Sequence, residues 1–116
     1  MAESASIKNN GVRVSVSAAA RSGGAGLSMR SFTQAMSRVG AMTESNDHTG
    51  ALRAVARYFK YNDLTERLEA VSREHIREGS MSWDNLQRRN QINDELLERI
   101  GREYGEDVRR RVYRNL

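Results

Sequence analysis

Residues 5–17 show the alternation of apolar and polar positions that is typical of a half-buried β-strand. Three valines are separated there by single polar residues: Val12, Val14 and Val16. The pair Asn10-Gly11 stands just before them, and Asn-Gly is the preferred pair for a two-residue type I′ turn. Such a turn places Ile7 opposite Val14, so that the apolar side chains share one face. We therefore predict a β-hairpin, and because a two-stranded hairpin alone is marginal in water, we expect it to lie on the protein body or on a neighbouring subunit.

After a Ser/Gly-rich linker at residues 18–26, the apolar spacing becomes helical. Ser31 and Gln34 have the spacing of a capping box and predict the start of a short helix. Its apolar stripe is Phe32, Ala35, Met36 and Val39. Residues 43–50 are polar and rich in turn formers, so they predict a loop. The most hydrophobic segment, residues 51–61, then predicts a helix with the stripe Leu52, Val55, Ala56 and Phe59.

Two further helices are predicted in the C-terminal half. Asp63 and Glu66 form a capping pair for the first, which we expect to stop at Gly79. Its apolar positions are Leu64, Leu68, Val71 and Ile76. Ser82 is the expected N-cap of a long helix toward the C-terminus, in which Gly101 and Gly105 are the expected points of bending or breakage. Among all these positions, we expect the core to include Phe59, Leu64 and Leu68.

These elements define the expected fold class. It is mainly α, with three to four helices, an N-terminal β-hairpin arm and a flexible Ser/Gly-rich linker. We divide the chain into a basic arm at residues 1–26 and a helical domain at residues 27–116. The length of 116 residues suits one small domain, and a hydrophobic share of 38% predicts a modest core. The chain has no proline, which fits uninterrupted helices.

Charge is distributed unevenly along the chain. From Met1 to Lys60, eight basic residues face three acids, a balance of +5, whereas Tyr61 to Leu116 holds eleven arginines and twelve acids, a balance of −1. The second half has seven acid–arginine pairs at the helical i,i+4 spacing: Asp63–Arg67, Glu69–Arg73, Asp84–Arg88, Glu95–Arg99, Glu98–Arg102, Glu106–Arg110 and Asp107–Arg111. These pairs predict a solvated helix surface. The basic, weakly hydrophobic arm is the part that we expect to meet a partner.

The sequence offers no strong catalytic or metal-binding motif. It has no cysteine, which excludes disulfides and thiolate metal sites. His48 and His75 lack a third ligand at a recognised spacing, and the glycines of residues 22–26 lack the lysine of a phosphate-binding loop. We therefore expect no enzyme activity and no cofactor. The N-terminus lacks the apolar stretch of a signal peptide and no run is long enough for a membrane span, so we expect cytoplasmic synthesis and no membrane partner, with a virion or an exported complex as further destinations.

Residues Arg57–Tyr61 interleave basic and aromatic side chains, a combination that binders of single-stranded nucleic acid use for phosphate contact and stacking. The candidate nucleic-acid contacts are Arg13, Arg21, Arg30, Arg57, Tyr58, Lys60 and Tyr61. A structural interpretation of the same segment competes with this one. Phe59 continues the core stripe, and Tyr58 or Tyr61 closes the helix corner with its hydroxyl in water.

The sequence favours a non-enzymatic structural or assembly subunit of a larger complex, of the phage-particle, export-machine or filament type. Its partners would be other protein subunits in a homo-oligomer or larger assembly. The arm would contact a neighbour through Ile7, Val12, Val14 and Val16. One alternative is a basic nucleic-acid-binding or regulatory protein. The other is a small adaptor, inhibitor or immunity-type protein that binds one partner.

Overall fold

A computed structural model describes residues 27–116 of the chain, and within that range the protein is mainly helical. Its helices are α1 (Met29–Glu44), α2 (His48–Tyr58), α3 (Asn62–Glu78), α4 (Trp83–Tyr104) and α5 (Glu106–Arg114). Five helices in the described range exceed the three to four that were expected. The predicted hairpin and linker lie in residues 1–26, outside the described residues. None of the five helices is long and apolar enough to cross a membrane.

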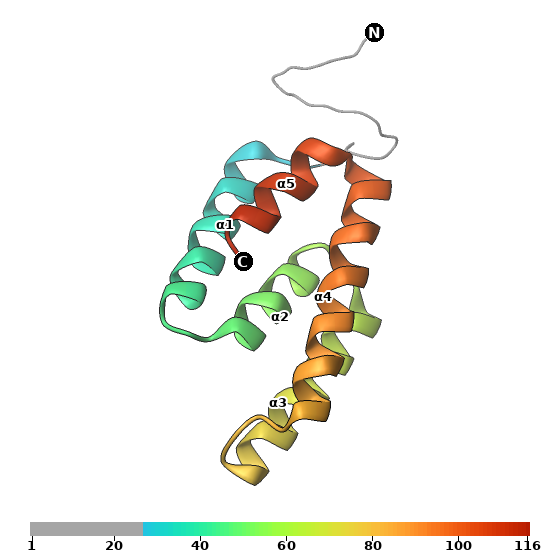
Figure 1. Cartoon of the computed structure of the whole chain (residues 1–116). Coiled ribbons are helices and arrows are strands. Elements are labelled where there is room, and N and C mark those ends of the chain that lie inside the picture. Colours follow the sequence, from blue (N-terminus) through green and yellow to red (C-terminus); the bar gives the residue numbers. More distant parts are fainter. Residues whose placement is uncertain (1–26) are drawn as a thin grey trace, which may run out of the picture.

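The helices form two groups that share one core (Figure 1). The α3–α4 hairpin, residues 62–104, runs along one side, and its turn projects beyond the other helices. The basic group consists of α1, α2 and α5 with their connections, residues 27–61 and 105–116. Within it α5 turns back from the end of α4, and the hydroxyl of Thr43 donates to the carbonyl of Asn115 at 2.8 Å, which ties the C-terminus to α1. The described body is elongated, with extents of 52 × 23 × 17 Å.

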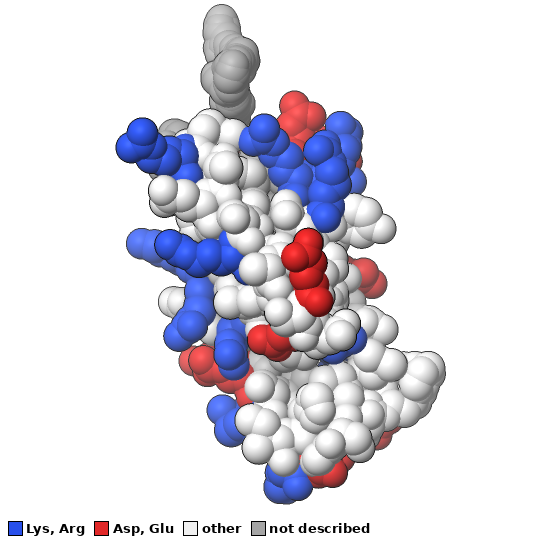
Figure 2. Space-filling model, turned by 90° about the vertical axis from the view of Figure 1, so that its left-hand side faces the viewer, with Lys and Arg blue, Asp and Glu red and all other residues white. Residues whose placement is uncertain are grey.

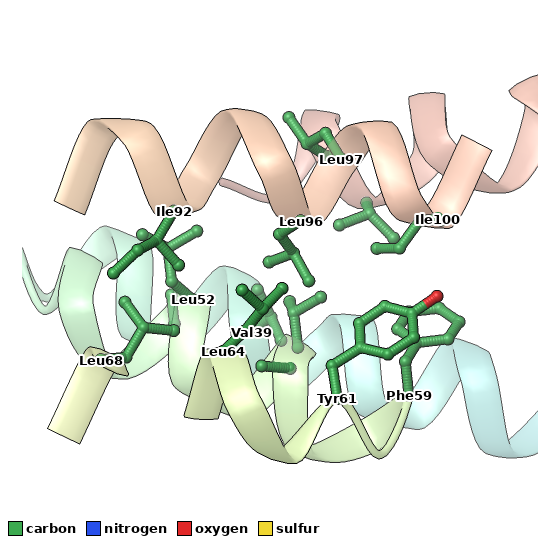
Figure 3. Close-up of a cluster of buried hydrophobic side chains, with 14 of the residues drawn as sticks. Val39, Leu52, Phe59, Tyr61, Leu64, Leu68, Ile92, Leu96, Leu97 and Ile100 are labelled. Carbon is green, nitrogen blue, oxygen red and sulfur yellow. The ribbon is translucent and has the colours of Figure 1, made fainter. Parts of the chain in front are cut away.

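The core is built from apolar stripes of all five helices. Its buried members are Phe32, Met36, Val39, Ala51, Leu52, Val55, Ala56, Phe59, Tyr61, Leu64, Leu68, Val71, Ile92, Leu96, Leu97, Ile100 and Val112. In Figure 3, Ile92 and Leu96 of α4 point toward Leu68 and Leu64 of α3, and Ile100 lies on the side of Tyr61. The expected core positions Phe59, Leu64 and Leu68 are confirmed. The prediction for Ile76 is wrong, because this end of α3 extends past the helices that could cover it.

Helix boundaries in the first half differ from those expected. The N-cap of α1 is Ser28, whose hydroxyl accepts from the backbone N–H of Ser31, so Ser31 itself is not the cap. The predicted loop at 43–50 shrinks to residues 45–47, because Asp47 caps α2 by accepting from the N–H of Gly50 at 3.0 Å. A side-chain acceptor that satisfies an exposed N–H allows a helix to begin earlier than its apolar stripe indicates.

In the second half, the local stop and start signals act as expected, with one exception. Gly79 adopts a left-handed conformation with φ of 78° and ends α3. The hydroxyl of Ser82 accepts from the N–H of Asn85 at 3.1 Å and starts α4. Gly105, with φ of 99°, breaks the long C-terminal helix into α4 and α5. The exception is the capping pair predicted at Asp63, because α3 begins after Tyr61 without a side-chain cap.

Candidate interaction surfaces

The segment Arg57–Tyr61 forms the tight turn between α2 and α3. Its centre is Lys60, whose φ is 63°, and the N–H of Tyr61 donates to the carbonyl of Ala56 at 2.9 Å. This left-handed step directs Phe59 and Tyr61 into the core and leaves Arg57 and Lys60 exposed. The turn therefore separates the aromatic from the basic side chains of the segment.

Tyr61 is buried, with only 7% of its surface exposed. Phe59 stacks on it with an interplanar angle of 19°, and the guanidinium of Arg99 lies 4.9 Å from its ring centroid. Its hydroxyl donates to Glu103 at 2.7 Å. Burial is the main cause that raises the pKa of Tyr61, and this hydrogen bond is the second cause. Tyr58 is half-buried and packs edge-on against Phe59. The rings thus close the helix corner, and Tyr61 leaves no face open to a nucleic-acid base.

The basic residues of α1 and α2 point outward. Arg30, Arg38, Arg57 and Lys60 are exposed and Arg53 is half-buried, and within residues 27–116 none of them forms an ion pair. Arg111 and Arg114 of α5 are exposed in the same way. Figure 2 shows Lys and Arg side chains along one edge and at the upper end of this face. These α5 residues come from the half of the chain whose charges balance overall, and the fold places them beside the basic residues of α1 and α2 (Figure 1).

Charge separates by helix group more sharply than by chain half. The basic group holds nine basic residues and four acids, whereas the α3–α4 hairpin holds seven arginines and ten acids. The net charges are therefore +5 and −3. The two helix groups of one chain therefore carry net charges of opposite sign.

Arginines of the hairpin are largely engaged by its own acids. Arg99 bonds both carboxylate oxygens of Asp63 at 2.9 Å and also reaches Glu95 at 3.0 Å, and Arg67 bonds Glu95 at 2.9 Å. Because Arg99 donates to it, the pKa of the Asp63 carboxyl falls to about 2. The sequence predicted an ion pair between Asp63 and Arg67 within α3. In the structure Asp63 pairs with Arg99 and Arg67 pairs with Glu95, so both ion pairs join α3 to α4. Glu95–Arg99, Glu98–Arg102 and Glu106–Arg110 do form as predicted.

The turn between α3 and α4 carries the most exposed large apolar side chains of the described residues. Ile76, in the last turn of α3, is 79% exposed, and Trp83, the first residue of α4, is 70% exposed. Gly79 and Ser82 fix the two helix ends between them, so both side chains flank one short turn. At the lower end of Figure 2, a broad uncharged area has acidic side chains beneath it. The helical pattern placed Ile76 among the apolar positions of its helix and did not indicate that it lies uncovered.

A polar cluster lies where the N-terminus of α2 crosses α4. The guanidinium of Arg89 is partly buried and approaches the hydroxyl of Thr49 at 3.4 Å. Asn85 is buried and accepts from Arg88 at 2.9 Å, while its Nδ2 atom has no hydrogen-bond partner within the described residues. Burial, and then the charge of Arg89, lowers the pKa of His48. His48 therefore lies in a helix contact, and residues 27–116 contain no group of three potential metal ligands.

The expected arm contacts Ile7, Val12, Val14 and Val16 lie outside the described residues, as do Arg13 and Arg21. No protein-family model matches this chain, and no curated protein or solved structure matches it either. The two surfaces with distinctive chemistry in residues 27–116 are the apolar end of the α3–α4 hairpin and the basic face of α1, α2 and α5.

Proposed function

We propose that this protein is a non-enzymatic assembly subunit whose copies associate through the apolar end of the α3–α4 hairpin. The observation that carries the proposal is the exposure of Trp83 and Ile76, at 70% and 79%, on the two sides of the turn between α3 and α4. Seventeen hydrophobic residues of the same domain are buried in its core. Trp83 and Ile76 are more exposed than any other large apolar residue of residues 27–116, and an uncovered tryptophan gains apolar burial only when a partner covers it.

The energetics favour Trp83 as the centre of such a contact. Full burial of a large apolar side chain contributes about 1.5–3 kcal/mol, and tryptophan is among the residues that most often dominate binding energy in interfaces. Ile76, on the other side of the same turn, adds a second anchor. Two anchors of this size support weak, reversible association, so we expect the fraction of associated chains to rise with protein concentration.

Sedimentation velocity of the full chain over a concentration series tests the proposal. Mass should rise with concentration, and Trp83→Ser or Ile76→Ser should weaken association at least tenfold. Tyr113→Ser is the matched control, because Tyr113 is 60% exposed but lies on α5, away from the turn. A chain that stays monomeric at every concentration, or a Tyr113→Ser effect equal to that of Trp83→Ser, contradicts the proposal.

Nucleic-acid binding is the second candidate, and the basic face is the observation that favours it. An exposed cation without an acidic neighbour attracts a phosphate with its whole charge, whereas the acid of an ion pair weakens that attraction. Arg38→Gln and Arg57→Gln should each weaken binding to a single-stranded oligonucleotide and reduce its salt dependence by about one counterion. Arg102→Gln is the control, because Arg102 is already paired with Glu98 at 3.3 Å. Binding that does not change with salt contradicts this candidate.

A further inference from the structure

We propose that the surface that covers Trp83 and Ile76 is the N-terminal arm of a second copy of the chain. The inference rests on the proposed assembly function and names the segment that docks. The predicted hairpin at residues 5–17 presents one apolar face, with Ile7 and the three valines, and that face needs a surface to lie on. The apolar end of the α3–α4 hairpin is an uncovered surface of matching chemistry within residues 27–116.

Charge supports the match between the two segments. Residues 1–26 hold three basic residues and one acid, a balance of +2. Residues 74–84, which surround Ile76 and Trp83, hold three acids and one arginine, a balance of −2. Opposite charges around an apolar contact favour encounter and exclude like-charged partners. The same acids repel a second α3–α4 end, which disfavours a symmetric contact between two such ends.

The reach of the arm favours docking on a neighbour over docking on its own copy. Leu27 begins the described body at the end opposite the α3–α4 turn, and the long axis measures 52 Å (Figure 1). Val16 stands only eleven residues before Leu27. Even a fully extended stretch of that length spans at most about 40 Å. Val16, the valine nearest the body, therefore falls short of the α3–α4 end of its own copy, and Val12, fifteen residues before Leu27, spans the axis only when every intervening residue is fully extended. Docking on another copy needs no such extension.

Arm-to-end docking joins two different surfaces, so each copy offers one donor and one acceptor. Contacts of this type continue from copy to copy and build rings or open chains. A copy with a disabled arm and a copy with a disabled α3–α4 end can then form only one contact between them. Mixing two such variants should give a pair and nothing larger.

This property supplies the test. Val14→Asp places a charge on the apolar face of the arm, and Trp83→Ser removes the main anchor of the α3–α4 end. Each variant alone should sediment as a 13.1 kDa monomer, and their mixture should form a species of two chains. The chain has one tryptophan, so emission in the mixture comes only from the Val14→Asp copy and should shift to shorter wavelength as Trp83 is covered.

Matched variants keep the test decisive. Arg13→Gln changes the opposite face of the predicted strand and should assemble like the natural chain, and Val16→Asp with Ile76→Ser should repeat the pairing of the first two variants. Val14→Asp that self-associates like the natural chain would overturn arm docking while leaving association through the α3–α4 end intact. A dilute monomer whose Trp83 emission is already at short wavelength, and shifts only with Val14→Asp, would show docking within one copy. A natural chain that is monomeric throughout would overturn the proposed function itself.

Discussion

The α3–α4 hairpin and the basic group of α1, α2 and α5 use their surface residues in opposite ways. In the hairpin, Arg99, Asp63 and Glu95 satisfy one another across two helices, and the apolar side chains at the turn remain uncovered. In the basic group, the core residues are covered, and the exposed arginines of α1 and α2 have no acidic partner within residues 27–116. The two groups share one core but have different surfaces. The α3–α4 turn exposes apolar side chains, whereas α1, α2 and α5 expose basic side chains. A partner can therefore distinguish the two ends of the molecule.

The largest expected effect tests whether α3 divides into a covered and an uncovered part. Leu68→Ala should lower the free energy of unfolding by about 2–5 kcal/mol, because Leu68 is fully buried and the change leaves a cavity. Ile76→Ala, two turns later on the same helix, should change it by less than about 0.5 kcal/mol. Urea unfolding followed by circular dichroism measures both. Similar losses for the two variants would mean that the end of α3 is covered in the isolated chain.

The next effect concerns the junction between the two groups. Gly105 has φ of 99° and ψ of 166°, a combination that only glycine adopts at low cost, so Gly105→Ala should destabilise the fold by about 1–3 kcal/mol. Gly101→Ala is the control on the same helix, because an added Cβ there meets the flexible Arg109 side chain at 3.2 Å. It should cost less than about 1 kcal/mol. Equal melting temperatures for the two variants would argue against a fixed junction.

A smaller effect tests the internal pairing of the hairpin. Arg99 depresses the pKa of Asp63 to about 2, so the pair stabilises the fold above about pH 4, and this contribution is lost as the pH falls toward 2. Asp63 is more than half exposed, which limits the gain to about 0.2–1 kcal/mol. Asp63→Asn should therefore unfold with a shallower acid dependence between pH 2 and 4. Superimposable acid profiles of the two proteins would mean that the pair does not form in solution.

The smallest effect lies where the two groups cross, at His48 and Arg89. Burial and the neighbouring guanidinium lower the pKa of His48, so the folded protein takes up this proton less readily than the unfolded chain. The contribution of neutral His48 to the free energy of unfolding is therefore fully present above pH 6.5 and declines as the pH falls below that value. His48→Gln should flatten the dependence of the unfolding free energy on pH between 5 and 7. A steeper dependence in the variant would contradict this placement, and His75→Gln, on the exposed face of α3, is the control.

Sequence patterns predicted the helical class, the stop at Gly79, the cap at Ser82 and the core positions Phe59, Leu64 and Leu68. They did not predict which partner each charge would choose. Arg99 has Glu95 at the helical spacing, but its bidentate bond goes to Asp63, 36 positions earlier in the chain. For Tyr61 they left two interpretations open, a nucleic-acid contact and a residue that closes the helix corner, and in the structure it turns inward onto Phe59. Both outcomes depend on how α3 and α4 lie together, which neighbouring residues do not encode.

The sequence by itself determined the features that depend on near neighbours. Caps, glycine stops and apolar stripes act within about two helix turns, so their residues are visible as local patterns. The tertiary structure alone decided exposure. Leu68 and Ile76 are both apolar residues of α3, yet Leu68 is buried and Ile76 is 79% exposed. Ile76 points about 80° away from Leu68 around the helix, and it lies where α3 extends beyond the helices that cover Leu68 (Figure 1). Burial requires a covering surface from elsewhere in the chain, and this requirement made the α3–α4 end the candidate contact surface.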